Sequence, residues 1–363
     1  MRFLFINQYG PPEPAPTARL LGELAEHLRA HSHEVEILSQ SLSYQGRPAR
    51  GGSRLRRELA ALFAILRAGW SRKRARPDLV VSLTSPPGLL VIAAVLARRH
   101  QTRLAHWAMD IYPELALALG ATVPAPIHLG LQEAMRWAYR RCVLVVALDE
   151  DMQSHLQNFY GVRNVRVLEP WPSADSAPRT ETANAADTPW IWLYSGNLGR
   201  AHEWRTLLDA QRLLETRGVP VRLVFQGDGS ARAAAVAYAE SIDLQRCEWK
   251  DYVPAIELSA SLTRARALVV TQRPETLGLL WPSKLALLER LPRPILFVGP
   301  TDGAIAKRLR LRAGTGIFAP GQSVEVADWV EHCQDSETVD PVPVDRPPLA
   351  DGCQQMEAWL TGV

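Results

Sequence analysis

The chain has 363 residues, more than one ordinary hydrophobic core holds, which predicts two domains. Its composition, 47% hydrophobic and 22% charged, is typical of globular proteins and excludes a fibrous or disordered chain. The formal net charge of +3 comes from one basic segment; the rest is net acidic, which disfavours a nucleic-acid partner.

Neither the cysteines nor the apolar runs indicate export or membrane insertion. The four cysteines are far apart, which predicts no metal site or disulfide scaffold and favours a reducing compartment. No stretch approaches the roughly 18 apolar residues of a spanning helix, and the apolar run after Arg2 is too short for a signal peptide. We expect a soluble or membrane-surface protein.

In the first half of the chain, continuous apolar strands alternate with helices. Strands are predicted at residues 3–6, 35–38, 79–83, 103–109, 142–148 and 165–168, and helices at 18–30, 88–99 and from 152 onward. Such strands are typical of a parallel sheet covered on both faces. A loop rich in proline, residues 7–17, joins the first strand to the first helix.

A polar segment then separates this half from a second alternation. Strands are predicted at 191–194, 222–225, 267–270 and 295–298, with helices at 204–216 and 231–242. We therefore expect a domain at 1–172, a linker or mobile loop at 173–189, a second domain at 190–345, and a C-terminal helix at 346–363 that packs back on the first domain.

Two glycine-containing turns follow strands of the second half. Ser195–Arg200 reads SGNLGR, and Gln226 is followed by Gly-Asp-Gly. Glycines allow backbone N–H groups to approach an anion, and a helix N-terminus adds partial positive charge. These turns indicate a phosphate site, although ordinary tight turns remain the alternative.

The segment Trp281–Leu285, WPSKL, reads as the start of a buried helix. Lys284 would then lie in the first turn, where the helix dipole disfavours a cation. An anion bound at the same end would relieve this conflict, so the position predicts a phosphate. The alternative is a solvated lysine.

At these residues the chain resembles glycosyltransferase family 4, especially its bacterial capsule, colanic-acid and O-antigen members. The matching segments, in family order, are FINQYGPPEPAPTARLLGELAEHL, VSLTSPPGLL, HWAMDIYPELALALG, YSGNLGRAHEWRTLLDA, FQGDG and WPSKLALLERLPRP. The resemblance implies an α/β fold of GT-B type, with two Rossmann-like domains whose parallel sheets face each other across a cleft.

The resemblance also implies roles for individual residues. In the donor-binding set it places Gly10, Gly196, Asn197, Gly227, Asp228, Tyr252, Val253, Pro254, Ser283 and Leu285. Arg200 and Lys284 would stabilise the departing diphosphate, while Asp110 and Glu114 would orient or deprotonate the acceptor hydroxyl. Thr17, as a helix cap, and His106 would lie on the acceptor side.

Some of these residues have ordinary structural alternatives, and one family feature is missing. Asp110 is also suited to cap a helix, and a buried core histidine is the favoured alternative for His106. Asp149-Glu150-Asp151 is better suited to a helix start than to a metal, so we expect no essential metal or cofactor. Many family members carry two glutamates seven residues apart; here Glu275 and Glu289 are out of register.

The basic segment, residues 54–76, has eight basic residues and one acid. Its first part predicts an amphipathic helix suited to an anionic membrane surface, or one that packs on the first sheet. The predicted membrane-binding residues are Arg54, Arg56, Arg57, Phe63, Arg67, Trp70, Arg72, Lys73 and Arg74.

Together these features predict a retaining glycosyltransferase. It would move a hexosyl or N-acetylhexosaminyl group from a UDP-sugar, in preference to a GDP-sugar, to a lipid-linked or oligosaccharide acceptor in cell-surface polysaccharide synthesis. We expect it in the cytoplasm, peripheral on the inner face of the plasma membrane. The alternatives are transfer to a soluble small molecule and a non-catalytic protein that binds sugar nucleotides.

Overall fold

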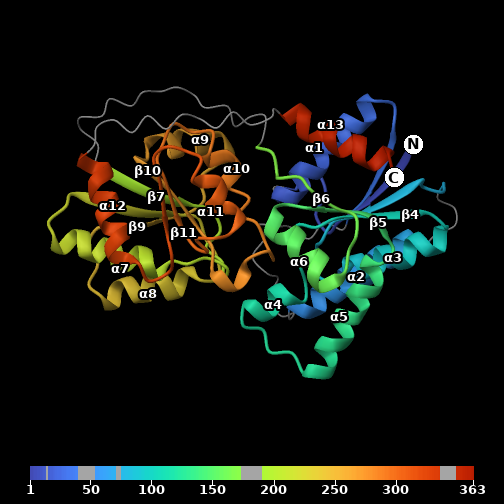
Figure 1. Ribbon diagram of the computed structural model, residues 1–363, viewed down its shortest axis with the longest axis horizontal. Helices are drawn as coiled ribbons and strands as arrows, with labels where there is room; N and C mark the ends of the chain where they lie inside the picture. Colours follow the sequence, from blue (N-terminus) through green and yellow to red (C-terminus); the bar gives the residue numbers. More distant parts are fainter. Residues whose placement is uncertain (14, 40–53, 71–74, 173–189, 336–348) are drawn as a thin grey trace. The chain divides into compact units, whose positions relative to one another are not determined.

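The computed structural model describes residues 1–13, 15–39, 54–70, 75–172, 190–335 and 349–363. The chain forms two compact units (Figure 1). Unit 1 contains Met1–Trp171, Gly278–Trp281 and Pro347–Val363, and unit 2 contains Pro172–Leu277 and Pro282–Arg346. No helix in the described ranges is long and apolar enough to cross a membrane.

Unit 1 is built on a six-stranded parallel sheet in the order β2-β1-β3-β4-β5-β6. Its strands are β1 (Arg2–Ile6), β2 (Glu34–Leu38), β3 (Leu79–Ser82), β4 (Arg103–Trp107), β5 (Cys142–Ala147) and β6 (Val165–Val167). Its helices are α1 (Pro16–Ala30), α2 (Arg54–Gly69), α3 (Leu89–His100), α4 (Glu114–Ala118), α5 (Ala125–Tyr139), α6 (Glu150–Tyr160) and α13 (Leu349–Thr361). The strand order reverses between β1 and β3, where sheets of this kind bind ligands.

Unit 2 repeats this architecture with the order β12-β11-β10-β7-β8-β9, again all parallel. Its strands are β7 (Trp190–Ser195), β8 (Val221–Gln226), β9 (Cys247–Lys250), β10 (Ala267–Thr271), β11 (Ile295–Val298) and β12 (Thr315–Phe318). Its helices are α7 (Arg205–Thr216), α8 (Arg232–Ser241), α9 (Ala255–Arg264), α10 (Leu285–Leu288), α11 (Ala304–Leu309) and α12 (Ser323–Asp335). Here the order reverses between β7 and β10.

The central strands are buried along their whole length, as their continuous apolar sequences predict. Residues 3–6 of β1 and all of β10 and β11 are almost inaccessible to solvent. Strand β9, by contrast, lies at the edge of its sheet and is half-exposed, so its sequence, CEWK, carries too little apolar signal to predict a strand. The expected α/β fold with two parallel sheets is thus confirmed, whereas the arrangement across a cleft stays a prediction.

Two segments from late in the chain belong to unit 1. Residues 278–281 pair with the segment after β4: the Ile111 amide donates to the Leu279 carbonyl at 2.8 Å, and Asp110 forms an antiparallel bridge with Leu280. Helix α13 packs on α1, with Gly352 against the ring of Trp171. The predicted second domain, 190–345, included residues 278–281. Local sequence pattern does not indicate that these four residues pack with unit 1 while their neighbours in sequence belong to unit 2.

Candidate functional site

The two glycine turns of unit 2 interlock through their backbones. The Gly196 amide donates to the Gln226 carbonyl at 2.8 Å, and the Leu198 amide donates to the Asp228 carbonyl at 2.7 Å. Gly227 has φ +132°, and a Cβ on it would overlap the carbonyl oxygen of Gly196. A residue with a side chain is excluded there by both conformation and space. The glycines therefore permit close approach of two loops at the carboxyl ends of β7 and β8.

Lys284 lies beside these turns. Its Nζ is 3.2 Å from the centroid of the Tyr194 ring and would be 3.7 Å from a Cβ on Gly196. The side chain is partly exposed as a whole, but its Nζ is buried and has no hydrogen-bond partner among the described residues. Burial lowers the pKa of Lys284 well below its ordinary value.

Burying the Lys284 ammonium group against an aromatic ring alone is energetically unfavourable. A cation over a ring gains about 0.5–2 kcal/mol, which is less than the several kcal/mol that desolvation of an ion costs. An anion bound beside Nζ would offset this cost and restore the charged form. The position of Lys284 therefore supports the predicted phosphate site; the predicted alternative, a solvated lysine, does not describe its buried Nζ.

The sequence did not reveal two further members of this cluster, Tyr194 and His202. The ring of His202 makes an edge contact with Tyr194 at 5.6 Å, and its Nδ1 lies 2.9 Å from the carbonyl oxygen of Thr271, at the end of β10. Burial, and to a smaller extent the charge of Lys284, lowers the pKa of His202 to about 3, so its imidazole is neutral. His202 therefore joins the loops after β7 and β10, where the strand order reverses.

Other predicted donor residues surround the turns. The Asn197 carbonyl accepts a hydrogen bond from the Tyr194 hydroxyl at 2.9 Å, and the half-exposed Tyr252 lies against Gly227 with its hydroxyl 3.4 Å from the Asp228 carbonyl. Val253 is partly exposed, and Pro254 is the exposed cap of α9. The structure thus brings Gly196, Asn197, Gly227, Asp228, Tyr252 and Lys284 together at one edge of the sheet.

Three expectations in this region need correction or restriction. Leu285 is fully buried and belongs to the hydrophobic core, so it is not a ligand contact. Ser283 and Arg200 are exposed. Helix α7 begins at Arg205, close to the predicted 204, so the SGNLGR turn is not itself a helix start; Lys284 precedes α10, which has only four residues. The helix-dipole argument is therefore weaker than expected, and burial of the amine is the stronger one.

The two glutamates near the expected family positions take part in ion pairs. Glu289 is buried and pairs with Arg308, whose Nε lies 2.7 Å from its carboxylate. Glu275 is exposed and pairs with Arg273 at 3.1 Å. Glu289 therefore stabilises the packing of α10 and α11, and neither residue replaces the missing pair.

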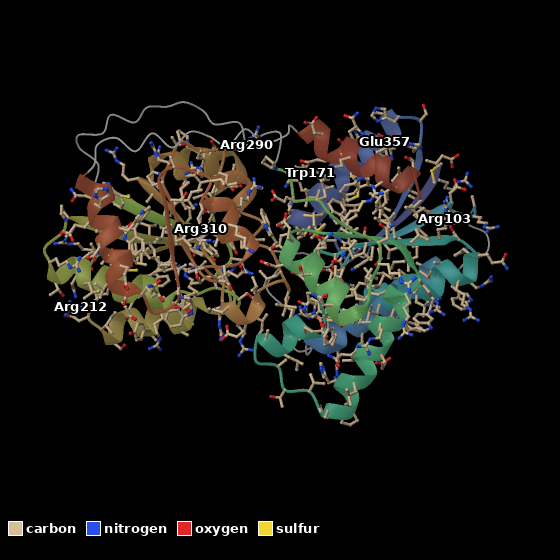
Figure 2. The ribbon with its side chains drawn as sticks, in the orientation of Figure 1. Arg103, Trp171, Arg212, Arg290, Arg310 and Glu357 are labelled. Carbon is tan, nitrogen blue, oxygen red and sulfur yellow. The ribbon has the colours of Figure 1, made fainter. Side chains whose placement is uncertain are left out.

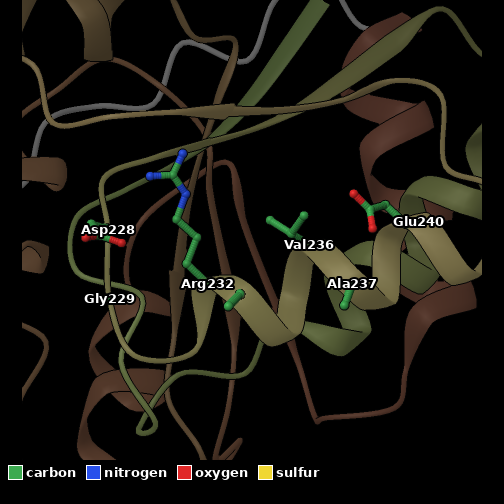
Figure 3. Close-up of a pocket in the computed structure, with 7 residues that line it drawn as sticks. Asp228, Gly229, Arg232, Val236, Ala237 and Glu240 are labelled. Atoms are coloured by element: carbon green, nitrogen blue, oxygen red, sulfur yellow. The ribbon is translucent and has the colours of Figure 1, made fainter.

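A hollow of about 430 Å³ lies beside the second glycine turn (Figure 3). It is lined by Asp228, Gly229, Arg232, Ala233, Val236, Ala237 and Glu240. Apart from the turn, these residues lie on one face of α8, and Asp228 is the one predicted donor residue among them. We therefore locate the candidate donor site from the interlocked turns and Lys284, not from this hollow.

In unit 1, the proline-rich loop begins at the reversal point of the sheet. The Gln8 amide donates to the Ser85 carbonyl at 2.7 Å, which joins the loops after β1 and β3. Gly10 does not have a positive φ; it is required because a Cβ would overlap Ser39. Thr17 does not cap α1, because the cap position is Ala15; its hydroxyl instead accepts a bond from Asn7 at 3.4 Å.

Asp110 follows β4 in the same unit. It is not a helix cap, because α4 has Pro113 at that position. Its backbone amide lies 3.4 Å from the Thr84 hydroxyl, and burial raises the pKa of Asp110 to about 6. Glu114 is instead held by Tyr160, whose hydroxyl lies 2.8 Å from its carboxylate, and by Gln132 at 3.1 Å. The geometry favours Asp110 over Glu114 as the acceptor-side carboxylate.

Two residues lie in structural surroundings. His106 is buried, its Nδ1 lies 2.9 Å from the Ser82 carbonyl, and burial lowers its pKa to about 4. This burial agrees with the alternative interpretation, a core histidine, but its Nε2 has no hydrogen-bond partner among the described residues, so the acceptor-side role stays a prediction. Asp149 caps α6 by accepting a bond from the Met152 amide at 2.7 Å, which confirms the helix start predicted for the acidic cluster.

Helix α2 forms as predicted, and its apolar residues divide between two faces. Ala61 and Ile65 are buried, whereas Leu59, Phe63 and Trp70 are 55%, 67% and 47% exposed. The side chains of Arg56, Arg57 and Arg67 are also exposed. Arg72, Lys73 and Arg74 lie outside the described residues, as does the side chain of Arg54. One face of α2 therefore packs within unit 1, as the second alternative predicts, whereas membrane binding by the exposed side chains stays a prediction.

Comparison with known proteins defines the fold class first. The chain shares its fold with Anabaena Alr3699/HepE, solved with UDP and glucose (TM-score 0.67, 15% identity, full coverage of both chains). Its fold is also similar to that of WaaG, a glycosyltransferase involved in lipopolysaccharide biosynthesis (TM-score 0.66, 14% identity, full coverage of both chains). A third is the catalytic domain of starch synthase IV from Arabidopsis thaliana, solved with ADP and acarbose (TM-score 0.68, 10% identity, 100% and 99% coverage). The fold is therefore that of two-domain glycosyltransferases of GT-B type.

The family-level match is narrower. Residues 17–171, which lie entirely within the first segment of unit 1, match the model of Glycosyltransferase Family 4. Among curated proteins, none matches the chain in sequence at a significant level. The match covers the unit that carries Asp110 and α2, whereas the candidate donor site in unit 2 rests on its geometry and on the shared fold.

Proposed function

We propose that the protein is a retaining glycosyltransferase that uses a UDP-sugar. The observation that carries this proposal is the buried Nζ of Lys284, which has no hydrogen-bond partner in the described part of the chain and lies beside two interlocked glycine turns. Solved proteins of the same fold have UDP, UDP with glucose, or UDP-glucose bound. A sugar diphosphate would supply the anion that this site needs.

The proposed chemistry divides between the units. In unit 2, Lys284 and Arg200 offset the negative charge that develops on the departing diphosphate. In unit 1, Asp110 accepts the proton of the acceptor hydroxyl; with its pKa near 6 it is mostly ionised at neutral pH and still basic enough to act. Neutral His202 fixes the position of Tyr194, over which the Lys284 amine lies. The resemblance to family 4 supports retention and a mechanism without an enzymic nucleophile.

The proposed acceptor is a lipid-linked glycan at the inner face of the plasma membrane, in cell-surface polysaccharide synthesis. The exposed Leu59 and Phe63 of α2 and Trp70 directly after it, flanked by exposed arginines, support membrane docking. Apolar side chains of this size enter the interfacial region of a bilayer, and arginines favour anionic lipids. We propose no metal or cofactor for the reaction.

Donor binding tests the central claim. In a thermal-shift assay, UDP-glucose should raise the melting temperature of the wild-type chain more than GDP- or ADP-sugars do, because ligands that bind only the native state stabilise it. Lys284→Ala should lose this shift and lower transfer by about 10²–10³-fold, as removal of one such cation or donor does. Lys307→Ala, on the exposed face of α11, is the matched control and should keep both.

The same assays separate the alternatives. Full transfer activity in Lys284→Ala would remove the phosphate assignment. Binding of UDP-glucose without transfer or hydrolysis would favour a non-catalytic protein. Activity on soluble acceptors together with a failure to sediment with anionic vesicles would favour the soluble-acceptor enzyme.

A further inference from the structure

Three histidines and one glutamate gather on unit 1, away from the residues discussed so far. His27 lies in the last turn of α1, His31 is the C-cap of that helix, and His33 precedes β2. Glu357, labelled in Figure 2, projects from α13, which packs on α1. Its carboxylate oxygens lie 2.8 Å from His27 Nε2, 3.3 Å from His31 Nδ1 and 3.0 Å from His33 Nε2.

The spacing of these atoms matches a transition-metal site. His27 and His31 are four residues apart and therefore share one face of the helix. With Glu357 they offer one ligand atom each, all within 4.8 Å of one another. Bonds of about 2.0–2.1 Å at tetrahedral angles separate zinc ligands by about 3.3 Å. Two of the three separations, 2.8 and 3.3 Å, are already close to that value.

We propose that His27, His31 and Glu357 bind a divalent transition metal of the zinc class. The donor set, two imidazoles and one carboxylate, suits Zn²⁺ better than Mg²⁺ or Ca²⁺, which prefer oxygen ligands. The side chain of His31 is 52% exposed, which leaves room for water as a fourth ligand. His33 bonds the other carboxylate oxygen and acts as a positioning residue.

The contacts of the cluster agree with this assignment. The Glu357 carboxylate is within hydrogen-bonding distance of imidazole nitrogens of His27 and His33, which belong to different parts of the chain. His31 Nδ1 also lies 3.0 Å from the His27 carbonyl, so this nitrogen donates a proton when no metal is bound. A metal ion at Nδ1 would replace this hydrogen bond, with the imidazole proton carried on Nε2.

The ion would act as a clamp between distant parts of the chain. Its ligands come from the end of α1 and from α13, which are more than 300 residues apart in sequence. Because the site exists only when α13 is docked, binding stabilises the docked state. The site is separate from the proposed transfer reaction, so the inference does not depend on the proposed function.

Titration of the metal-stripped full chain with Co²⁺ and Zn²⁺ tests the proposal. We expect the visible absorption of tetrahedral Co²⁺ to saturate at a single equivalent, Zn²⁺ to displace it, and Zn²⁺ to raise the melting temperature. His31→Ala, at a half-exposed position that tolerates truncation, and Glu357→Gln should each abolish the tetrahedral spectrum. His33→Ala should weaken binding about 10–100-fold, as loss of an outer-shell partner does.

The exposed His332 on α12 supplies the matched control, and His332→Ala should bind Co²⁺ as the wild-type chain does. The proposal is overturned if His31→Ala binds as tightly as the wild type, if bound Co²⁺ shows only the weak spectrum of six-coordinate aqueous ions, or if His332→Ala lowers affinity to the same degree.

Discussion

The reversal points of the two sheets carry opposite chemistry. In unit 2, a buried amine lies against an aromatic ring beside backbone turns that only glycine permits. In unit 1, the loops after β1 and β3 carry buried amide and hydroxyl side chains, among them Asn7 and Thr84, and Asp110 follows the next strand. The same type of parallel sheet thus holds, in unit 2, a buried amine with no anionic partner among the described residues and, in unit 1, a carboxylate whose pKa is raised.

Under the proposed function, the scaffold fixes where ligands bind and the loops decide which ligands. A phosphate suits the first centre, because it neutralises the amine. A sugar hydroxyl suits the second, because a carboxylate with a raised pKa accepts a proton readily. The proposed division into a donor unit and an acceptor unit follows from this contrast, and each prediction below tests one side of it.

The largest expected effect is on the acceptor side. Asp110→Asn should lower transfer by about 10²–10⁴-fold, the usual contribution of a general base, while the UDP-glucose thermal shift stays unchanged. As the matched control, Asp151→Asn, which changes another carboxylate of unit 1 at the start of α6, should retain activity. If Asp110→Asn abolished donor binding as Lys284→Ala is expected to do, the two centres would not be separable.

The pH dependence of stability tests the raised pKa of Asp110 directly. Because the pKa of Asp110 is raised to about 6 from 3.8, the native state binds more protons than the unfolded state between these values, and this residue's contribution to stability is lost as pH rises through them. Removal of the ionisable group should therefore make Asp110→Asn more stable than the wild type at pH 7. Urea unfolding at pH 4 and pH 7 measures this, and equal stability of the two chains at both values would contradict it.

The next effect concerns the backbone of the donor side. Gly227→Ala should destabilise the chain by about 3 kcal/mol or more, because it combines strain at positive φ with overlap against a neighbouring carbonyl. Gly218→Ala is the matched control: it has φ +78° but nothing near its Cβ, so we expect a cost of about 1 kcal/mol. Similar losses for both, by denaturant unfolding, would show that the interlocked turns are not tightly packed.

The smallest effect concerns a surface of unit 1. Phe63→Ser should weaken binding to anionic vesicles about tenfold, because a Phe side chain gains about 1.5–3 kcal/mol on full burial and is only partly inserted at an interface. Leu311→Ser, an 87% exposed apolar residue in unit 2, should leave binding unchanged. Vesicle sedimentation that shows no difference between the two variants would remove α2 from the membrane proposal.

Much of the fold follows from local pattern. Continuous apolar strands such as 295–298 predicted central parallel strands, and Asp149 was recognisable as a cap from the acids that follow it. The edge strand β9 was missed because half-exposed strands carry little apolar signal. The glycine turns were singled out from residue type and position after a strand, and Lys284 from its place at an expected helix start. The reason given for Lys284, the helix dipole, proved weaker than the burial of its amine.

The contacts between residues far apart in sequence, by contrast, are visible only in the tertiary structure. Tyr194 contacts both Lys284 and His202, and the Tyr160 hydroxyl donates a hydrogen bond to Glu114. Glu357, near the C-terminal end of the sequence, lies within hydrogen-bonding distance of His27 in α1. Local rules act over about four residues along a helix and two along a strand, so they determine elements and turns. Which elements become neighbours depends on how the whole chain buries its apolar surface. The side chains proposed for the chemistry of both units are brought together by these contacts between elements.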